Sequence, residues 1–231
     1  MISASSFSRH SSHAATMDRV YRYQRHFYDL TRKYYLVGRD RLLRDLRIPD
    51  AGRVLVVGCG TGRNLIVAAR RNPQALFYGL DISRQMLSTA EVAARRAGVA
   101  GRTFTVEGDA ETFHAKSAFG VAGFDRILMS YSLSMIPNWQ RALSQCALQL
   151  APQGEIHIVD FGQMERWPRF ARHAMRRWLR KFHVEPRSGL IVEAAELARK
   201  HGFDITATPI GGGYAWMIVI KQHSHRNGQK H

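Results

Sequence analysis

The period of the hydrophobic pattern changes along the chain, and the change separates an N-terminal segment from a longer central region. Residues 1–15 are rich in Ser and His and show no apolar period, which predicts a disordered tail. Over 16–47 apolar residues recur at helical spacing among many charges, which predicts a helical cap. Gly38 is expected to divide this cap into two helices.

From residue 48 onward, short apolar runs alternate with helical segments. Strands are predicted at 54–57, 75–80, 103–107, 124–130 and 155–160, and helices at 64–71, 83–96 (with Ser83 as N-cap) and after Pro137 to about 150. Because the strands are apolar throughout, the alternation predicts an α/β fold in which helices cover both faces of a mostly parallel sheet.

The C-terminal part of the sequence predicts antiparallel strands at one edge of the sheet. A helix over 193–201 closes at Gly202, and strands at 203–208 and 214–221 are joined across a run of glycines. These two strands are expected to form an antiparallel pair at one edge of a seven-stranded sheet. The domain is thus predicted over 48–221, with a polar tail at 222–231.

The composition narrows the class of protein. The chain has 231 residues, and 45% of them are hydrophobic, which is enough for one sizeable core. No apolar run reaches about 18 residues and the first residues lack an apolar signal core, so a cytoplasmic protein is expected. The two cysteines indicate a reducing compartment without a disulfide framework.

The formal net charge of +16 is unevenly distributed, and this suggests where an anionic partner binds. Residues 48–161 carry eleven Lys/Arg and nine Asp/Glu, whereas residues 1–47 and 162–203 each carry ten Lys/Arg and four Asp/Glu. A near-neutral core with basic flanking segments is therefore predicted.

The second basic segment is predicted to form an amphipathic helical insertion over 163–187. Its bulky apolar residues recur at three- and four-residue spacing between arginines, a pattern typical of helices that lie in a bilayer interface. An anionic membrane is the expected partner, although the apolar side could instead pack on the core. The predicted membrane-binding residues are Trp167, Phe170, Arg172, Arg176, Arg177, Trp178, Arg180 and Lys181.

A glycine-rich turn follows the first predicted strand and carries the strongest chemical signal. Gly58, Gly60 and Gly62 stand at a strand-to-helix junction, where glycines let a ligand approach the backbone closely. The second strand ends at Asp81, which is placed to accept both ribose hydroxyls. The third ends at Asp109, whose carboxylate could accept from an adenine amino group.

With these three elements in register, residues 53–161 resemble the class I S-adenosylmethionine-dependent methyltransferases. The resemblance implies a Rossmann-like fold, with the glycine turn around the methionine end, Asp81 on the ribose and Asp109 on the adenine. It implies S-adenosylmethionine as methyl donor and no metal. The cofactor residues that it implies are Gly58, Cys59, Gly60, Gly62, Asn64, Asp81, Ile82, Met86, Asp109, Ala110 and Ser130.

The segment after the fourth strand bears on the acceptor. Enzymes that methylate nucleobase amines usually carry Asn/Asp-Pro-Pro-aromatic there, whereas this chain has Met-Ser-Tyr-Ser-Leu-Ser-Met-Ile-Pro at 129–137. This segment resembles small-molecule and lipid methyltransferases, so nucleic acid is not the expected partner.

The stretch over 17–42, together with 58–65 and 159–162, resembles the N-methyltransferase of betaine-lipid synthesis. Enzymes of that kind convert diacylglyceryl-homoserine to diacylglyceryl-trimethylhomoserine with three molecules of S-adenosylmethionine. A peripheral membrane location and an upstream lipid-synthesis enzyme as partner follow from the resemblance.

The candidate acceptor-side residues are aromatic and basic. Aromatic faces attract the quaternary ammonium product by cation–π interaction, and arginines suit the substrate carboxylate. Expected substrate residues are Tyr21, Tyr23, Tyr35, Arg25 and Arg32; residues expected to position the amine or accept its proton are Tyr28, Tyr131 and His26. Each could equally be a structural residue.

Two other functions stay open at this point. One is methylation of another small-molecule amine or of RNA. The other, of a different class, is a methyltransferase-like module that binds nucleic acid without turnover; the intact glycines and both acids count against it.

Overall fold

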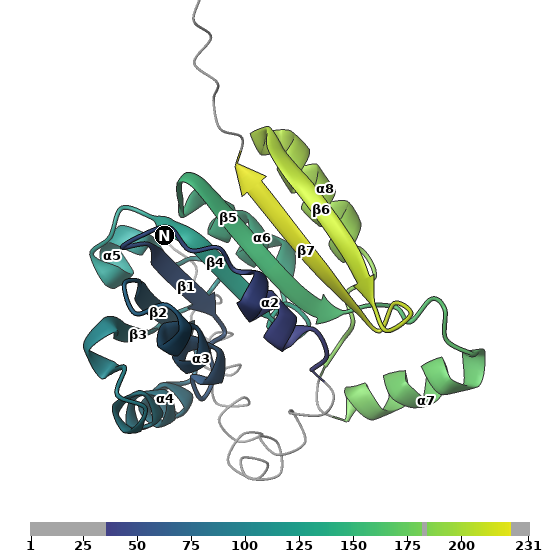
Figure 1. Ribbon diagram of the computed structural model, residues 1–231. Coiled ribbons are helices and arrows are strands. Elements are labelled where there is room, and N and C mark those ends of the chain that lie inside the picture. The colour runs from purple at the N-terminus through teal and green to yellow at the C-terminus, as the bar shows by residue number, and fades with distance from the viewer. Residues whose placement is uncertain (1–35, 182–183, 223–231) are drawn as a thin grey trace, which may run out of the picture.

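One seven-stranded sheet forms the centre of the computed structural model, which describes residues 36–181 and 184–222 (Figure 1). The strand order is β3-β2-β1-β4-β5-β7-β6, and β1 to β5 run parallel. The predicted α/β class with a mostly parallel sheet is confirmed. The strands are β1 (Arg53–Val57), β2 (Leu76–Asp81), β3 (Thr103–Glu107), β4 (Phe124–Ser130), β5 (Leu150–Phe161), β6 (Phe203–Ile210) and β7 (Ala215–Gln222).

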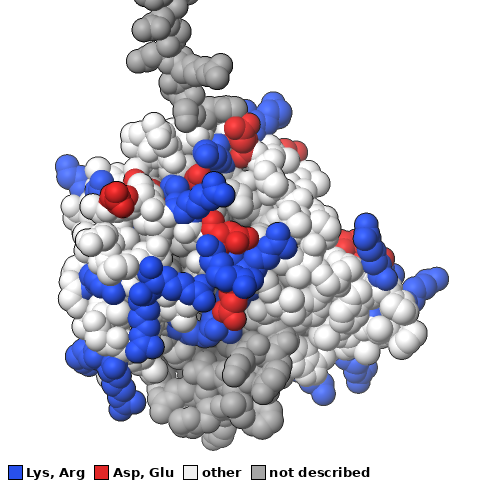
Figure 2. Space-filling model, in the orientation of Figure 1, with Lys and Arg blue, Asp and Glu red and all other residues white. Residues whose placement is uncertain are grey.

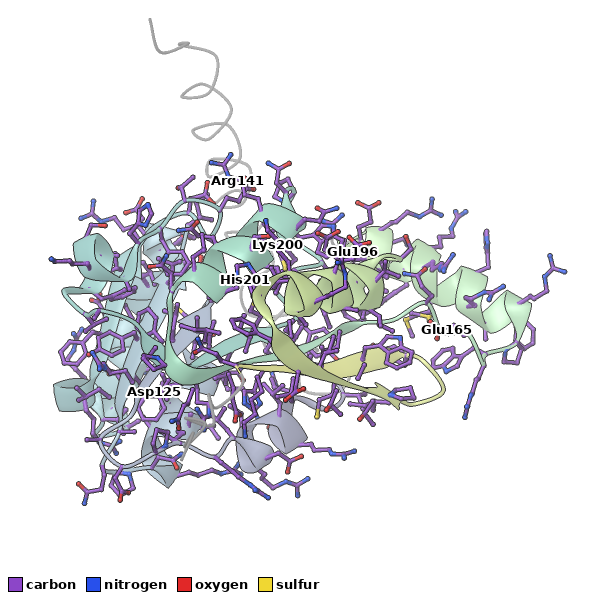
Figure 3. The ribbon with its side chains drawn as sticks, turned by 90° about the horizontal axis from the view of Figure 1, so that it is seen from above. Asp125, Arg141, Glu165, Glu196, Lys200 and His201 are labelled. Atoms are coloured by element: carbon purple, nitrogen blue, oxygen red, sulfur yellow. The ribbon has the colours of Figure 1, made fainter. Side chains whose placement is uncertain are left out.

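Helices cover both faces of this sheet. One face packs against α2 (Arg39–Asp45), α3 (Arg63–Arg71), α4 (Arg84–Arg96) and part of α7 (Arg169–Arg180). The other packs against α5 (Ala115–Phe119), α6 (Trp139–Leu148) and α8 (Leu190–His201). Figure 3 shows Arg141 of α6 and Lys200 of α8 on one side, with α2 on the opposite side.

The sequence of β1 explains why it sits at the centre of two layers. Val54 and Val56 pack into one core cluster, and Leu55 and Val57 pack into the other. Because successive side chains point to opposite faces of a strand, an unbroken apolar run is needed wherever both faces are covered. All four side chains are at most 1% exposed.

The C-terminal edge is built by the predicted antiparallel pair. β7 pairs antiparallel with both β5 and β6, so the antiparallel strand lies one place inside the edge and β6 occupies the edge itself. A tight turn at Gly211, Gly212 and Gly213 joins them, with φ of 58°, 67° and 86°. The segment after β5 donates to this turn, from Met164 N to Gly213 O (2.8 Å) and from Arg166 N to Gly212 O (3.1 Å).

The structure corrects four local predictions. β5 begins at Leu150, ahead of the strand predicted at 155–160, and contains an irregular stretch with Gln153 at φ 64°. α7 occupies 169–180 only, because Pro168 stands at its N-cap. α8 begins at Leu190, three residues early, and the short α5 had no periodic signal.

The N-terminal cap is only partly described. α2 begins directly after Gly38, whose φ is 88°, where the second helix of the cap was expected to start. The expected disordered tail at 1–15, the rest of the cap to residue 35, and residues 223–231 of the polar tail lie outside the described residues. Within 36–181 and 184–222, no helix is long and apolar enough to cross a bilayer.

A buried carboxylate with three basic neighbours, one of them the exposed Lys221, joins β4, β5 and β7. Glu155, with 12% of its side chain exposed, lies 2.9 Å from His157 Nε2, 3.5 Å from Arg126 Nε and 3.3 Å from Lys221 Nζ. The hydrogen bond from His157 and the nearby positive charges lower the pKa of Glu155 to about 2, against the opposing effect of burial.

This cluster predicts a pH-dependent contribution to stability. A depressed carboxyl pKa stabilises the folded state above the unfolded value of about 4.5, and the contribution is lost as the pH falls from there toward 2. Glu155→Gln should lower the free energy of unfolding by about 2–3 kcal/mol at pH 7. Urea unfolding from pH 7 to pH 3 measures this. Glu107→Gln, which alters an exposed ion pair, is the control. If the difference in unfolding free energy between the unsubstituted protein and Glu155→Gln stays constant down to pH 3, the assignment is contradicted.

Candidate active site

The carboxyl ends of four parallel strands meet at one edge of the sheet and bring the predicted cofactor residues together. Along this edge the order is β3, β2, β1, β4. Asp109 follows β3, Asp81 ends β2, the glycine turn follows β1 and Ser130 ends β4. Ligands of open parallel sheets bind outside the carboxyl ends where the strand order reverses, and β1 and β4 flank that point here.

The glycine turn needs glycine for both conformation and space. Gly58, Gly60 and Gly62 have φ of 65°, 55° and 83°, a region that L-residues rarely adopt. A Cβ on Gly62, the N-cap of α3, would stand 2.8 Å from the Cβ of Ala90 in α4. The turn therefore brings α3 close to α4 and presents its own backbone to the edge of the sheet.

Asp81 ties this turn to the start of α4. Its Oδ2 accepts from Gly60 N (2.8 Å) and its Oδ1 from Ser83 N (3.0 Å). Ser83 in turn caps α4, since its Oγ accepts from Met86 N, as predicted. A carboxylate can accept about four hydrogen bonds, so these two orient Asp81 in a way that is compatible with a bound ribose.

Asp109 plays a similar part after β3. Its Oδ1 accepts from Glu111 N (2.8 Å), which fixes the turn that contains Ala110. Glu111, only 8% exposed, accepts from the backbone and the side chain of Asn138 (3.3 and 2.9 Å) and so joins this turn to the loop after β4. Sequence reasoning did not single out Glu111, because its partner is 27 residues away.

Two hydroxyls beside the glycine turn fit a polar ligand. Ser130 Oγ and Ser132 Oγ are buried, and neither has a hydrogen-bond partner within the described part of the chain. A Cβ on Gly58 would stand 2.8 Å from the Cβ of Ser132, so the loop lies directly against the turn. Buried hydroxyls normally have partners, so this pair is suited to a ligand that approaches the glycines.

The remaining predicted cofactor residues lie around this edge. Ile82 is half-buried after β2, and Met86 is buried in α4. Cys59 is buried in the turn, where burial raises the pKa of its thiol, so it packs and is not a nucleophile. Asn64 lies in the first turn of α3, half-buried.

Tyr131 is the one predicted acceptor-side residue within the described part. It has a left-handed φ of 56°, is 2% exposed, and its hydroxyl donates to Val37 O at 2.5 Å. Burial raises the pKa of its hydroxyl. This geometry suits a positioning role between the loop after β4 and the segment before α2 better than a proton acceptor. The other acceptor-side candidates, Tyr21, Tyr23, Arg25, His26, Tyr28, Arg32 and Tyr35, lie outside the described residues.

The predicted membrane-binding residues divide into two groups. Trp167 donates its indole N–H to Gly211 O (2.8 Å) and stacks on Tyr214 at 5.6 Å; with the half-buried Trp178 it packs on the core. Phe170 is 79% exposed. The basic residues Arg176, Arg177, Arg180 and Lys181 are exposed, and Arg172 is half-buried.

The comparison with known families fits this geometry. A family model described as a methyltransferase domain matches residues 48–200. The chain belongs to this methyltransferase family. Fold and family together make it a class I enzyme that uses S-adenosylmethionine as methyl donor. In the described ranges, no three His, Cys, Asp or Glu side chains gather to hold a metal ion.

Several relatives of the family are similar to the chain. It is 25% identical to the ubiquinone/menaquinone biosynthesis C-methyltransferase UbiE of Syntrophotalea carbinolica, over 86% of this chain and 81% of that protein. It is 28% identical to the phosphatidylethanolamine N-methyltransferase of Cereibacter sphaeroides, over 51% and 54%.

Other matches are partial or show the fold alone. A protein from Synechococcus is 33% identical over 52% of this chain, which spans only 28% of that protein. The S-adenosylmethionine-dependent methyltransferase SibL has the same fold, with a TM-score of 0.65 and 21% identity over 86% of this chain and 58% of SibL.

The end of β5 contacts the loop after β4 through a buried acid that pattern alone did not single out. Asp160, 1% exposed, accepts from Ser134 N (3.1 Å) and Phe161 N (2.8 Å). Burial raises its pKa to about 6, although these donors oppose the shift. Its place at the end of β5, within the quoted segment 159–162, was the available signal.

The Asp81 geometry predicts a large effect on cofactor binding. Asp81→Ala removes both a ribose acceptor and the partner of Gly60 N, and hydrogen bonds to charged groups are each worth about 1.5–3 kcal/mol. The dissociation constant of S-adenosylmethionine should rise by about tenfold to a hundredfold or more. Titration calorimetry measures it, with the exposed Asp50→Ala as control. Unchanged affinity in a folded variant would refute the assignment.

A pair of glycine variants separates conformation from packing. Gly98 has φ 71° with nothing near its position for a Cβ, whereas Gly62 has φ 83° and faces Ala90. Gly98→Ala should cost about 1–2 kcal/mol for the left-handed backbone. Gly62→Ala should cost about 1–3 kcal/mol more, through overpacking. Chemical denaturation gives both values. Equal losses of unfolding free energy in the two variants would show that α3 and α4 are not closely packed at Gly62.

Proposed function

We propose that this enzyme methylates the amine of a lipid headgroup, and specifically converts diacylglyceryl-homoserine to diacylglyceryl-trimethylhomoserine. Three observations support the proposal. The segments 17–42, 58–65 and 159–162 resemble betaine-lipid N-methyltransferases. One relative is named a phosphatidylethanolamine N-methyltransferase, and others are named for demethylmenaquinone methylation or ubiquinone/menaquinone biosynthesis. The α7 helix offers a surface suited to an anionic bilayer.

The chemistry asks little of the protein beyond placement. Held by the glycine turn, Asp81 and Asp109, S-adenosylmethionine would supply an electrophilic methyl group to the amine nitrogen, and its sulfur would leave as a neutral thioether. A free amine loses its proton readily to water, so the residues mainly position and desolvate the acceptor. In our proposal Ser130 and Ser132 face the reacting end, because they lie on the β4 side of the glycine turn, away from Asp81 and Asp109.

The α7 helix carries the membrane part of the proposal. It projects from the body of the protein at the carboxyl end of β5 (Figure 1). Leu179 is buried and Met175 and Trp178 pack against the core, which leaves Phe170 and most of the basic side chains exposed, with Arg172 half-buried. We define the α7 docking surface as Phe170, Arg172, Arg176, Arg177, Arg180 and Lys181.

The charge of the helices extends this argument. The helices α2, α3, α4 and α7 carry fourteen arginines and three acidic residues, whereas α5, α6 and α8 carry four basic and two acidic residues. Figure 2, which faces α2, α3 and α4, shows basic side chains in excess there and on the protruding α7. An anionic membrane on the α7 side would therefore meet the positive part of the protein. We also propose a cytoplasmic enzyme, peripherally bound, that receives its lipid from an upstream lipid-synthesis enzyme.

Two other acceptors are tested in the same experiment. Quinone C-methylation is favoured by the similarity to the ubiquinone/menaquinone biosynthesis C-methyltransferase, because the match covers 81% of that protein. RNA is favoured only by the positive charge.

The decisive assay offers labelled S-adenosylmethionine to the full-length protein with liposomes that contain diacylglyceryl-homoserine. Parallel samples contain phosphatidylethanolamine, a demethylated quinone or structured RNA. We expect label in the mono-, di- and trimethylated homoserine lipids. Label only in the quinone or in RNA would overturn the proposal and assign the acceptor. No label in any sample, with intact S-adenosylmethionine binding, would also overturn it.

Charge reversal on α7 tests membrane docking separately. Each basic residue near an anionic surface contributes about 1 kcal/mol, so reversing Arg172, Arg177 and Arg180 to Glu should weaken binding to anionic liposomes by about a hundredfold or more. The matched control reverses Arg141, Arg199 and Lys200 on α6 and α8. Cosedimentation at fixed ionic strength measures both. If both triple variants lose the same binding to anionic liposomes, binding depends only on the net charge of the protein and not on α7.

A further inference from the structure

One arginine holds the loop after β4 from its outer side. Arg187 Nε donates to Leu133 O (3.2 Å), and its Nη2 donates to Ile136 O (2.8 Å) and, at a longer distance, to Ser134 O (3.5 Å). Only 14% of the arginine side chain is exposed. A single guanidinium thus satisfies three carbonyls of a short loop that has no regular secondary structure.

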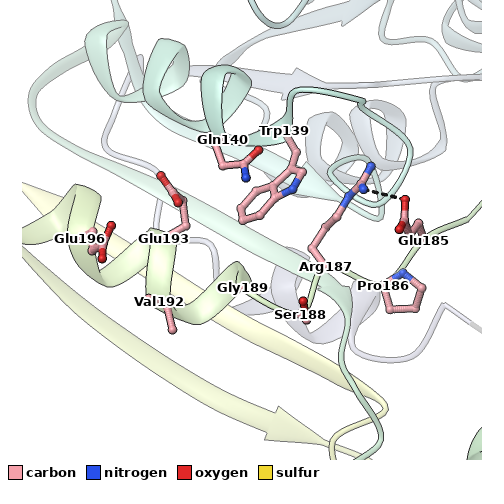
Figure 4. Close-up of a pocket in the computed structure, with 10 residues that line it drawn as sticks. All are labelled: Trp139, Gln140, Glu185, Pro186, Arg187, Ser188, Gly189, Val192, Glu193 and Glu196. Carbon is pink, nitrogen blue, oxygen red and sulfur yellow. Dashed lines mark hydrogen bonds and ion pairs between the residues drawn. The ribbon is translucent and has the colours of Figure 1, made fainter.

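The arginine is itself held in place. Its Nη1 donates to Glu185 Oε2 (3.0 Å), as Figure 4 shows. The neighbouring backbone adds a second link to the loop, from Glu185 N to Ser134 O (3.1 Å). Gln163 Nε2 donates to Pro186 O (3.0 Å), and Arg176 of α7 donates to Gln163. The segment from 184 to 187 therefore connects the loop after β4 to α7.

The inner side of the same loop faces the candidate site. Asp160 accepts from Ser134 N, so the loop is held between this carboxylate and Arg187. Ser132 lies against Gly58, with its buried hydroxyl lacking a partner in the described residues. A shift of the loop would move Ser132 relative to the glycine turn.

We propose that Arg187 is a positioning residue for methyl transfer: its bridge to three carbonyls sets where Ser132 stands beside the glycine turn. An arginine suits this role because its planar guanidinium donates in fixed directions along one edge, whereas a lysine ammonium is a point charge that cannot span the same carbonyls. The inference rests on the methyltransferase site and does not depend on which acceptor the enzyme uses.

The test compares Arg187→Ala, Arg187→Lys and the control Arg141→Ala, an exposed arginine of α6 on the same side of the sheet. In the two Arg187 variants, amides 132–136 should exchange hydrogen faster, and the dissociation constant of S-adenosylhomocysteine should rise by about tenfold. With an active acceptor, kcat should fall by about tenfold or more, while KM for the lipid changes little. Added methylguanidinium should restore part of the lost affinity in Arg187→Ala only.

Several outcomes would overturn the proposal. If exchange rises but S-adenosylhomocysteine affinity and kcat stay at the values of the unsubstituted protein, Arg187 only stabilises the loop. If Arg187→Lys behaves like the unsubstituted protein, the bridging geometry is not needed. Should Arg187→Ala fail to fold, the lysine variant decides alone. If no acceptor is methylated, the proposed lipid function fails, and the S-adenosylhomocysteine measurement still decides the role of Arg187.

Discussion

Parallel pairing of β1 with β2 on one side and with β4 on the other is the constraint on which the site depends. It brings every strand-to-helix turn of this half of the sheet to one edge, so residues as far apart as Gly58 and Ser132 become neighbours. Within this arrangement Asp81 supplies the local connection, because its two oxygens accept from the glycine turn and from the start of α4. The backbone of the turn is consequently ordered by the same carboxylate that is proposed to hold the ribose.

The two buried acids of β5 show how the surroundings of a carboxyl group decide the direction of its pKa shift. Glu155 has three basic neighbours, and its pKa falls to about 2. Asp160 has mainly backbone N–H partners and almost no solvent, and its pKa rises to about 6. The first acid ties β4, β5 and β7 together by charge. The second holds a loop by hydrogen bonds, at the end of the strand that borders the site.

The parts of the fold and the site that follow from short stretches of sequence could be predicted. The glycine turn and the Ser83 cap depend on residues a few positions away, Asp81 stands at the end of a predicted strand, and the apolar strands signal a sheet covered on both faces. The start of β5 was missed because Pro152 and Gly154 normally mark a turn, whereas here they lie in an irregular stretch of strand. Arg187 gave no signal, since its carbonyl partners lie 51 to 54 residues earlier in the chain. Trp167 resembled a membrane residue by spacing alone, and only the fold reveals its partner Gly211, 44 residues away.

The glycine triplet between β6 and β7 has a consequence for how the α7 arm can vary. The Glu165 carboxylate and the Trp167 indole fill the space where side chains at Gly213 and Gly212 would begin, and all three glycines have left-handed φ. A side chain at Gly213 would overlap the Glu165 carboxylate, so a substitution there requires the segment before α7 to move as well. The turn between β6 and β7 and the segment before α7 therefore pack as one unit, and a change at Gly213 calls for a matched change at Glu165.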